Sequence, residues 1–138
     1  MSVPFSDFKM RGLRFQYWFT AICATSLGLA IMLFPRTTEK LFMWKKQDDI
    51  MFGIGGSVYF AFGILSLLGL KNPKKWAPIL LLQFAYKMSW FILVVWRLSK
   101  RGELDMRSSW ALIAGYAAFV AGDLWAVPFG YLLNSQAN

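Results

Sequence analysis

The chain has 138 residues, of which 57% are hydrophobic and 18% aromatic, and it carries a formal net charge of +8. The hydrophobic share exceeds the roughly 45–50% of an average soluble domain. A strongly basic soluble chain would suggest nucleic-acid binding, but all except one of the 15 lysines and arginines flank apolar segments, where phospholipid headgroups explain them. We therefore expect membrane lipids as partners, and no nucleic acid.

Histidine is absent, and Cys23 is the single cysteine. This composition excludes a histidine-ligated haem, zinc or copper site, a multi-cysteine metal site and an intrachain disulfide. The sequence also lacks a nucleophile–base pair that would indicate catalysis. We expect no metal, no cofactor and no catalytic residues, so any redox role would need a borrowed cofactor or a partner subunit.

Four apolar segments each reach the roughly 20 residues that cross a hydrocarbon core, and they show almost no polar face at the helical period. The sequence therefore predicts an all-α, four-transmembrane-helix bundle in a polytopic integral membrane protein, located in the inner membrane if the chain is bacterial. The predicted regions are a basic amphipathic segment at 1–14, a transmembrane domain at 15–133 with spans at 15–34, 50–70, 77–96 and 110–133, and a polar tail at 134–138.

The N-terminal segment 1–14 mixes large apolar residues with lysine and arginine, which is typical of an anchor that lies on the membrane surface. In the first span, Gln16, Thr20 and Cys23 form a weak polar stripe, which we expect to face other helices. The link to the second span alternates charged and apolar residues. It predicts a short interfacial helix, with Trp44 at the level of the headgroups.

Small residues recur at every fourth position in the second and fourth spans. In a membrane, such a face lets another helix backbone approach closely. We expect both faces to be buried against neighbouring helices, and the fourth-span face is also a candidate contact in a homo-oligomer. The residues are Gly53, Ser57 and Ala61 in the second span and Ala114, Ala118, Gly122 and Ala126 in the fourth.

Two spans contain an ionisable residue. Lys87 lies about ten residues from the start of the third span and Asp123 about ten from the end of the fourth, so both are about 15 Å below the same membrane surface. Because an unpaired charge at that depth costs about 2.5–3.5 kcal/mol on insertion scales, we predict an ion pair between them, with Tyr59 as its third member. The neighbours expected to line the same interior are Gln83, Tyr86 and Trp90.

Two interpretations of this cluster stay open. In one, the pair fixes helix register and has no other role. In the other, it marks a functional site, as intramembrane ionisable residues usually do. The first functional hypothesis is an accessory subunit or a binder of a lipid-like or quinone-like ligand, whose headgroup displaces or bridges the Lys87–Asp123 pair. The alternative is an oligomeric, proton-coupled small transporter in which Asp123 titrates and Lys87 is its counter-ion.

The sequence Gln-Phe-Ala-Tyr-Lys-Met-Ser-Trp at 83–90, followed one span later by Gly-Asp-Leu at 122–124 and Val-Pro-Phe at 127–129, resembles a group of small four-span bacterial membrane proteins. In size and hydropathy the chain is also similar to the broad DoxX-like set of four-helix membrane proteins. DoxX-like proteins are associated with membrane oxidoreductase assemblies and quinones, so the resemblance implies such a partner or ligand here.

Overall fold

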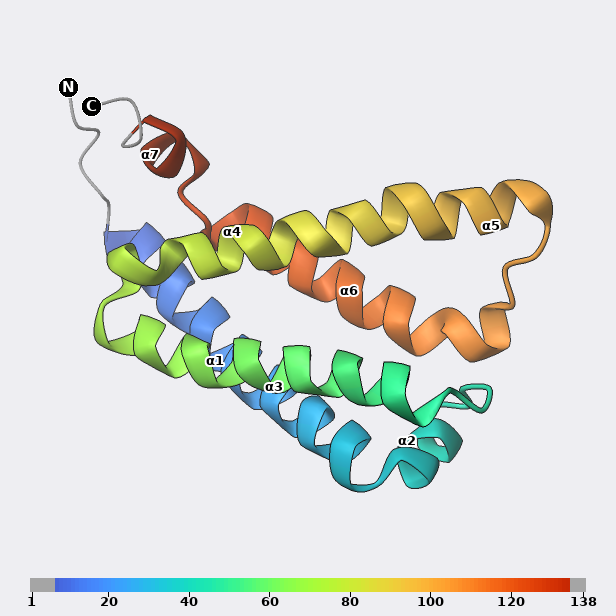
Figure 1. Ribbon diagram of the computed structural model, residues 1–138. Coiled ribbons are helices and arrows are strands. Elements are labelled where there is room, and N and C mark those ends of the chain that lie inside the picture. The colour runs from blue at the N-terminus through green and yellow to red at the C-terminus, as the bar shows by residue number, and fades with distance from the viewer. Residues whose placement is uncertain (1–6, 135–138) are drawn as a thin grey trace.

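The computed structural model describes residues 7–134, and every regular element in this part of the chain is a helix (Figure 1). The predicted all-α fold class is therefore confirmed. In chain order the elements are α1 (Asp7–Leu33), α2 (Pro35–Leu41), α3 (Asp49–Lys71), α4 (Pro73–Trp90), the π-helical turn η1 (Phe91–Val95), α5 (Trp96–Arg101), α6 (Met106–Ala126) and α7 (Phe129–Asn134).

Four helical stretches are long and apolar enough to cross a membrane: α1, α3, the continuous stretch of α4, η1 and α5, and α6. This agrees with the predicted multi-pass integral membrane protein. The 27 residues of α1 span about 40 Å at 1.5 Å per residue, which exceeds the roughly 30 Å of a hydrocarbon core. A helix of that length crosses a bilayer tilted, and α1 runs obliquely past α3 in Figure 1.

The distribution of polar and apolar side chains is reversed relative to a soluble protein. The fully buried side chains include Gln16, Gln83 and Asp123, whereas large apolar side chains such as Ile22 and Leu93 are more than half exposed. In water an apolar exterior of this extent would drive aggregation, but in a bilayer it faces acyl chains. The helices therefore turn their polar side chains inward and hydrogen-bond them to one another.

The most extensive helix–helix contact joins α1 and α3, and it depends on glycines. A Cβ atom added at Gly28 of α1 would lie 2.5 Å from the backbone nitrogen of Phe60, and one added at Gly63 of α3 would lie 2.6 Å from the backbone nitrogen of Thr25. Only glycine permits backbones to approach this closely, so these residues set the register between the two helices.

For the second span, the prediction named the wrong face of the helix as the packing face. Ser57 and Ala61 are exposed, and a Cβ atom added at Gly53 would meet nothing within 4 Å. The face that packs against α1 instead contains Gly56 and Gly63. Several glycines occupy different faces of α3, so four-residue spacing alone selected a set that the fold leaves open to the outside.

The predicted face of the fourth span is used only at its C-terminal half. Ala126 is buried and Gly122 lies against the side chain of Gln16, but Ala114 and Ala118 are exposed in the single chain. The burial predicted for these two alanines within the bundle is therefore wrong, because α6 diverges from its neighbours toward its N-terminus. Their contact with a second copy of the chain stays a prediction.

Two predicted boundaries also differ from the structure. Residues 7–14 continue directly into the first span as part of α1, since no helix-breaking residue separates them; residues 1–6 and 135–138 lie outside the described part. The fourth span ends at Ala126 instead of Leu133, because Pro128 lacks the N–H that a continuing helix needs. The short α7 follows this break.

The helices are not packed evenly around the bundle. Helix α6 contacts α1 and α4, and α4 contacts α3, but the backbones of α3 and α6 do not come into contact. Helix α5 contacts only the π-helical turn that precedes it. The bundle is therefore close-packed at the end that carries the α3–α4 turn and opens between α3 and α6 at the opposite end (Figure 1).

Candidate functional site

Asp123 is fully buried, and two glutamine side chains hold its carboxylate. The Gln16 amide nitrogen donates to Oδ1 at 2.8 Å, and the Gln83 amide nitrogen lies 3.3 Å from both carboxylate oxygens. The Gln83 amide also donates to Thr20 Oγ1 at 3.2 Å. Helices α1, α4 and α6 therefore each supply one side of a buried hydrogen-bonded centre.

Both glutamines keep an unsatisfied acceptor. Gln16 Oε1 and Gln83 Oε1 are buried and have no hydrogen-bond partner among the described residues. Each amide must turn its nitrogen toward the carboxylate, which directs its oxygen elsewhere. This arrangement indicates that the centre is built to stabilise a buried acid on α6.

Lys87 is 2% exposed and lies in an aromatic cage. Its ammonium nitrogen donates to the Tyr86 hydroxyl and lies 4.3, 5.0 and 4.4 Å from the ring centroids of Tyr86, Tyr116 and Phe119. Cation–π attraction of this kind is worth about 2 kcal/mol when the cation is desolvated. The cage therefore stabilises the buried charge from the ring faces.

The predicted Lys87–Asp123 ion pair does not form. The ion pairs among residues 7–134 all involve groups near the helix ends, and neither Lys87 nor Asp123 takes part in one. The carboxylate is held by glutamine donors and the ammonium by aromatic rings. Asp123 also lies in the last turn of α6, which ends at Ala126, instead of ten residues from the end of the span as predicted. Neither this helix end nor the rotation of each helix about its axis was predicted from the sequence.

Tyr59, the predicted third member, bonds instead to the Tyr116 hydroxyl, and this contact bridges α3 and α6 where their backbones diverge. Trp90 packs against the same ring, with centroids 4.9 Å apart, and Tyr86 lies 6.1 Å from it. The predicted residues Tyr59, Tyr86, Lys87 and Trp90 thus gather around Tyr116, whereas Gln83 belongs to the Asp123 centre.

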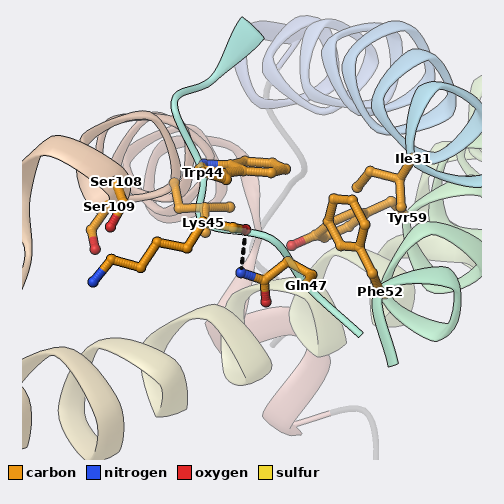
Figure 2. Close-up of a pocket in the computed structure, with 10 residues that line it drawn as sticks. Ile31, Trp44, Lys45, Gln47, Phe52, Tyr59, Ser108 and Ser109 are labelled. Atoms are coloured by element: carbon orange, nitrogen blue, oxygen red, sulfur yellow. Dashed lines mark hydrogen bonds between the residues drawn. The ribbon is translucent and has the colours of Figure 1, made fainter. Parts of the chain in front are cut away.

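A cavity of about 300 Å³ lies above Tyr59, between α3 and α6. The link between α2 and α3 covers it, and Figure 2 shows side chains converging on it from this link, from α3 and α6, and from α1, which supplies Ile31. No residue of the Asp123 centre lines it. Its walls are Ile31, Trp44, Lys45, Gln47, Phe52, Gly55, Tyr59, Ser108, Ser109 and Leu112.

The walls of the cavity have two chemical sides. Phe52, Tyr59 and Ile31 form an apolar side, while the Lys45 ammonium and the two serine hydroxyls lie together on the other in Figure 2. A second groove of about 190 Å³, between α3 and α4, is lined by apolar side chains alone. The first cavity therefore combines apolar walls with hydrogen-bonding groups at one side, as ligand sites usually do.

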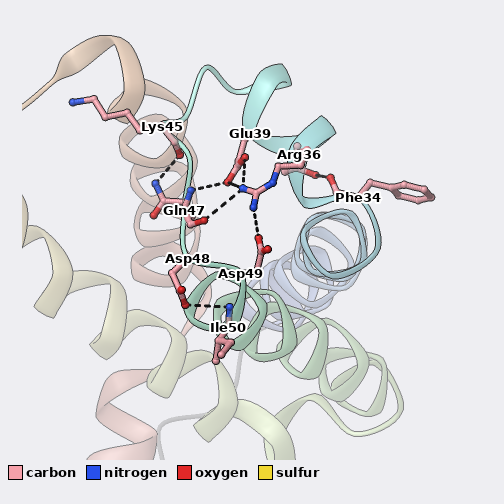
Figure 3. A network of polar contacts seen from close by, with 9 residues as sticks. Phe34, Arg36, Glu39, Lys45, Gln47, Asp48, Asp49 and Ile50 are labelled. Atoms are coloured by element: carbon pink, nitrogen blue, oxygen red, sulfur yellow. Dashed lines mark hydrogen bonds and ion pairs between the residues drawn. The ribbon is translucent and has the colours of Figure 1, made fainter.

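A polar clamp shapes the link that covers the cavity (Figure 3). Arg36 donates to Glu39 at 2.9 and 3.0 Å and to Asp49 at 2.6 Å, and the Gln47 backbone N–H donates to Glu39 at 2.7 Å. Met43 adopts the left-handed conformation, with φ 56°, which reverses the chain after α2. The clamp and this turn together direct residues 44 and 45 toward the cavity.

The clamp and the α6 cap perturb the nearby carboxyl groups outside the spans. The Gln47 N–H, and after it the Arg36 guanidinium, lower the pKa of Glu39 from its ordinary value of 4.5. Asp105 caps α6 by accepting from the Arg107 backbone N–H, and it pairs with Lys45 at 3.1 Å. The hydrogen bond from Lys45 lowers the pKa of Asp105.

Sequence reasoning missed several residues that these sites use. Gln16 and Thr20 had been identified as a polar stripe but not as partners of Asp123. Nothing in the spacing indicated the cavity, because its covering residues lie in a link and its floor in two spans that are not adjacent in sequence. The residues concerned are Gln16, Thr20, Trp44, Lys45, Ser108, Ser109, Tyr116 and Phe119.

Comparison of the chain with models of protein families, with curated proteins and with solved structures finds no match. The resemblance of the third and fourth spans to small four-span bacterial proteins, and of the whole chain to the DoxX-like set, therefore stays a prediction. Among residues 7–134 no group of three or more acidic or cysteine side chains is placed to hold a metal ion.

Proposed function

We propose that this integral membrane protein binds one lipid-like ligand in the cavity between α3 and α6. The observation that carries the proposal is the separation of these two helices above the Tyr59–Tyr116 bridge, which creates the cavity within an otherwise close-packed bundle. A bundle of four spans has no structural need for such a space. If the chain is bacterial, the membrane concerned is the inner membrane.

The walls favour an amphipathic ligand. The cavity of about 300 Å³ is at the lower end of the range for ligand pockets, so it accommodates a headgroup and its first attached carbons. The remainder of the ligand lies along the apolar outer surface of α3, where Ile54 and Val58 are exposed. A quinone-like molecule and a phospholipid both fit this description.

The ligand differs in position from the one predicted at the Lys87–Asp123 cluster. Asp123 and Gln83 are fully buried and fully surrounded by helices, and neither lines the cavity. We assign them to the packing of α1, α4 and α6. Lys87 connects to the cavity only indirectly, through the Tyr116 ring and the hydroxyl of Tyr59.

Two glycines of α3 provide a matched test. Gly55 lines the cavity and Gly53 does not, and a Cβ atom added at either meets nothing within 4 Å. Leucine favours a helix more than glycine does, by a similar amount at both positions. Gly55→Leu therefore adds apolar volume at the cavity wall with no clash at its Cβ atom, and Gly53→Leu is its control. The measurement is mass spectrometry of lipids that remain bound after purification in mild detergent.

We expect the wild-type chain and Gly53→Leu to retain one ligand per chain and Gly55→Leu to lose it. Equal retention by both variants would contradict the proposal. The transporter alternative is tested separately by Asp123→Asn in liposomes, because a titrating carboxylate is required for pH-dependent flux. Loss of such flux in this variant would favour the transporter alternative.

A further inference from the structure

One wall of the cavity contains a hydrogen-bond donor that nothing in the described structure satisfies. The Trp44 indole nitrogen is buried and has no acceptor among residues 7–134. The indole ring is held firmly, since it stacks on Phe42 with centroids 4.9 Å apart and meets the edge of Phe52 at 5.7 Å. Buried donors in native proteins are nearly always paired, so this N–H indicates an acceptor supplied from outside the chain.

The same side of the cavity carries further donors. Figure 2 shows the nitrogen of the Trp44 ring directed toward the side on which Ser108, Ser109 and the Lys45 ammonium lie. The Ser108 hydroxyl donates to the Asp105 carbonyl at 3.3 Å, but the Ser109 hydroxyl has no hydrogen bond to any described side chain or backbone group. The Trp44 indole N–H and the Ser109 hydroxyl therefore lie without an acceptor among the described residues, beside the Lys45 ammonium, whose acceptor is Asp105.

We infer that this side of the cavity recognises the phosphate of an anionic phospholipid headgroup, bound by Trp44 Nε1, Lys45 Nζ and Ser109 Oγ. The inference rests on the proposed ligand-binding function and specifies its ligand. A phosphate offers several acceptor oxygens and a negative charge, and lysine is a frequent partner for it. A quinone carbonyl would satisfy one donor and leave the others unpaired.

Asp105 competes with the proposed phosphate for the Lys45 ammonium. Its carboxylate pairs with Lys45 at 3.1 Å, and the Lys45 side chain is 75% and the Asp105 side chain 41% exposed. An exposed pair of this type is weak, and the lysine ammonium has three N–H donors, so Lys45 can hold the carboxylate and a phosphate oxygen together. The neighbouring Lys46 does not line the cavity and serves as a matched control.

The headgroup position also suits the location of the cavity. The link after α2 and the start of α6 both lie at one end of the bundle, where the membrane-spanning helices begin or end. A phosphate held there is at headgroup level, and the acyl chains leave along the apolar outer surface of α3, because the Tyr59–Tyr116 hydrogen bond closes the space between α3 and α6. A free phosphate ion would leave the apolar side of the cavity, formed by Ile31 and Phe52, uncovered.

The experiment measures competition for the purified full-length chain by native mass spectrometry. The probes are phosphatidylglycerol, a diacylglycerol with the same acyl chains, ubiquinone and inorganic phosphate. The variants are Lys45→Met with Lys46→Met as control, Trp44→Phe with the exposed Trp110→Phe as control, and Asp105→Asn. Asparagine still caps α6 well, so Asp105→Asn removes the competing charge without removing the cap.

We expect the wild type to prefer phosphatidylglycerol over diacylglycerol. Each of the variants Lys45→Met and Trp44→Phe should reduce this preference by about tenfold. Asp105→Asn should keep or increase it, and both controls should leave it unchanged. An equal loss in Lys45→Met and Asp105→Asn would mean that Lys45 only forms the ion pair, which overturns the inference. Preference for ubiquinone, or displacement of lipid by inorganic phosphate, would also overturn it.

The failure of this inference is distinguishable from failure of the proposed function. If Gly55→Leu loses bound ligand but the ligand is not a phospholipid, the cavity binds a ligand and only the headgroup assignment is wrong. If Gly55→Leu retains the same lipids as Gly53→Leu, no ligand occupies the cavity and both proposals are wrong.

Discussion

At the scale of single residues, the interior of the bundle separates its two ionisable groups. Asp123 is bound by amide donors from two other helices, and Lys87 is surrounded by aromatic rings. Removing one partner of a buried polar group leaves the other unsatisfied, at a cost of about 1–3 kcal/mol. The glutamines should therefore be coupled energetically to Asp123 more strongly than Lys87 is.

A double-mutant cycle tests this coupling. We expect Gln83→Leu and Asp123→Leu to show an interaction free energy of about 1–3 kcal/mol, measured by chemical unfolding in detergent. The cycle between Lys87→Met and Asp123→Leu should give less. Ser66→Ala is the control for additivity, because Ser66 bonds only to the Phe62 carbonyl of its own helix. If the interaction free energy with Asp123 were larger for Lys87 than for Gln83, it would indicate a direct ion pair between Lys87 and Asp123.

At the scale of helices, the contact between α1 and α3 predicts a sharp difference between two glycines. A Cβ atom at Gly28 would lie 2.5 Å from the Phe60 nitrogen and 2.6 Å from the Gly56 carbonyl oxygen, both of which belong to backbone. We expect Gly28→Ala to destabilise the protein by about 1–3 kcal/mol, as overpacking does. Thermal unfolding in detergent measures the effect.

Gly53→Ala is the control, because Gly53 lies on α3 outside its contact with α1. Its Cβ atom would meet nothing within 4 Å, and alanine favours a helix over glycine by about 1 kcal/mol. This variant should therefore be as stable as the wild type or more stable. Destabilisation of Gly53→Ala to the same degree as Gly28→Ala would mean that the predicted face at residues 53, 57 and 61 packs after all.

The link that covers the cavity should loosen in acid. The lowered pKa of Glu39 means that its carboxylate stabilises the folded link at pH values above its ordinary 4.5, and that this contribution is lost as the pH falls through the lowered pKa. We expect hydrogen exchange at the Gln47 amide, corrected for its intrinsic pH dependence, to lose protection over that range. Glu39→Gln should remove this pH dependence, and protection unchanged in acid would contradict the role of the clamp.

Hydropathy was sufficient to predict four spans, because crossing a membrane requires length and apolar character, which a sequence displays directly. Residue counting misplaced Asp123 within its span, because α6 ends at Ala126, before Pro128. The face of α3 that packs against α1 was not predictable, because α3 carries glycines on several sides. Only the tilt and rotation of α1 select Gly56 and Gly63. The cavity depends on those same rotations, so it could not be predicted from the sequence.

At the scale of the whole molecule, residues 7–134 consist of four stretches long and apolar enough to cross a membrane, joined by short links and short helices. A function within the bilayer and the accessory-subunit role both stay predictions. The unequal packing of the bundle, closed at one end and open between α3 and α6 at the other, is the feature that distinguishes it from a simple four-helix anchor.

The most direct test of the bound ligand is photo-crosslinking in native membranes with benzoylphenylalanine at Phe52, which lines the cavity, and at Phe34, which is 63% exposed and does not. Crosslinked lipids are then identified by mass spectrometry. We expect position 52 to capture one lipid class in clear excess over its share of the membrane, and position 34 to capture lipids in their bulk proportions. Bulk proportions at both positions would contradict a specific ligand in the cavity.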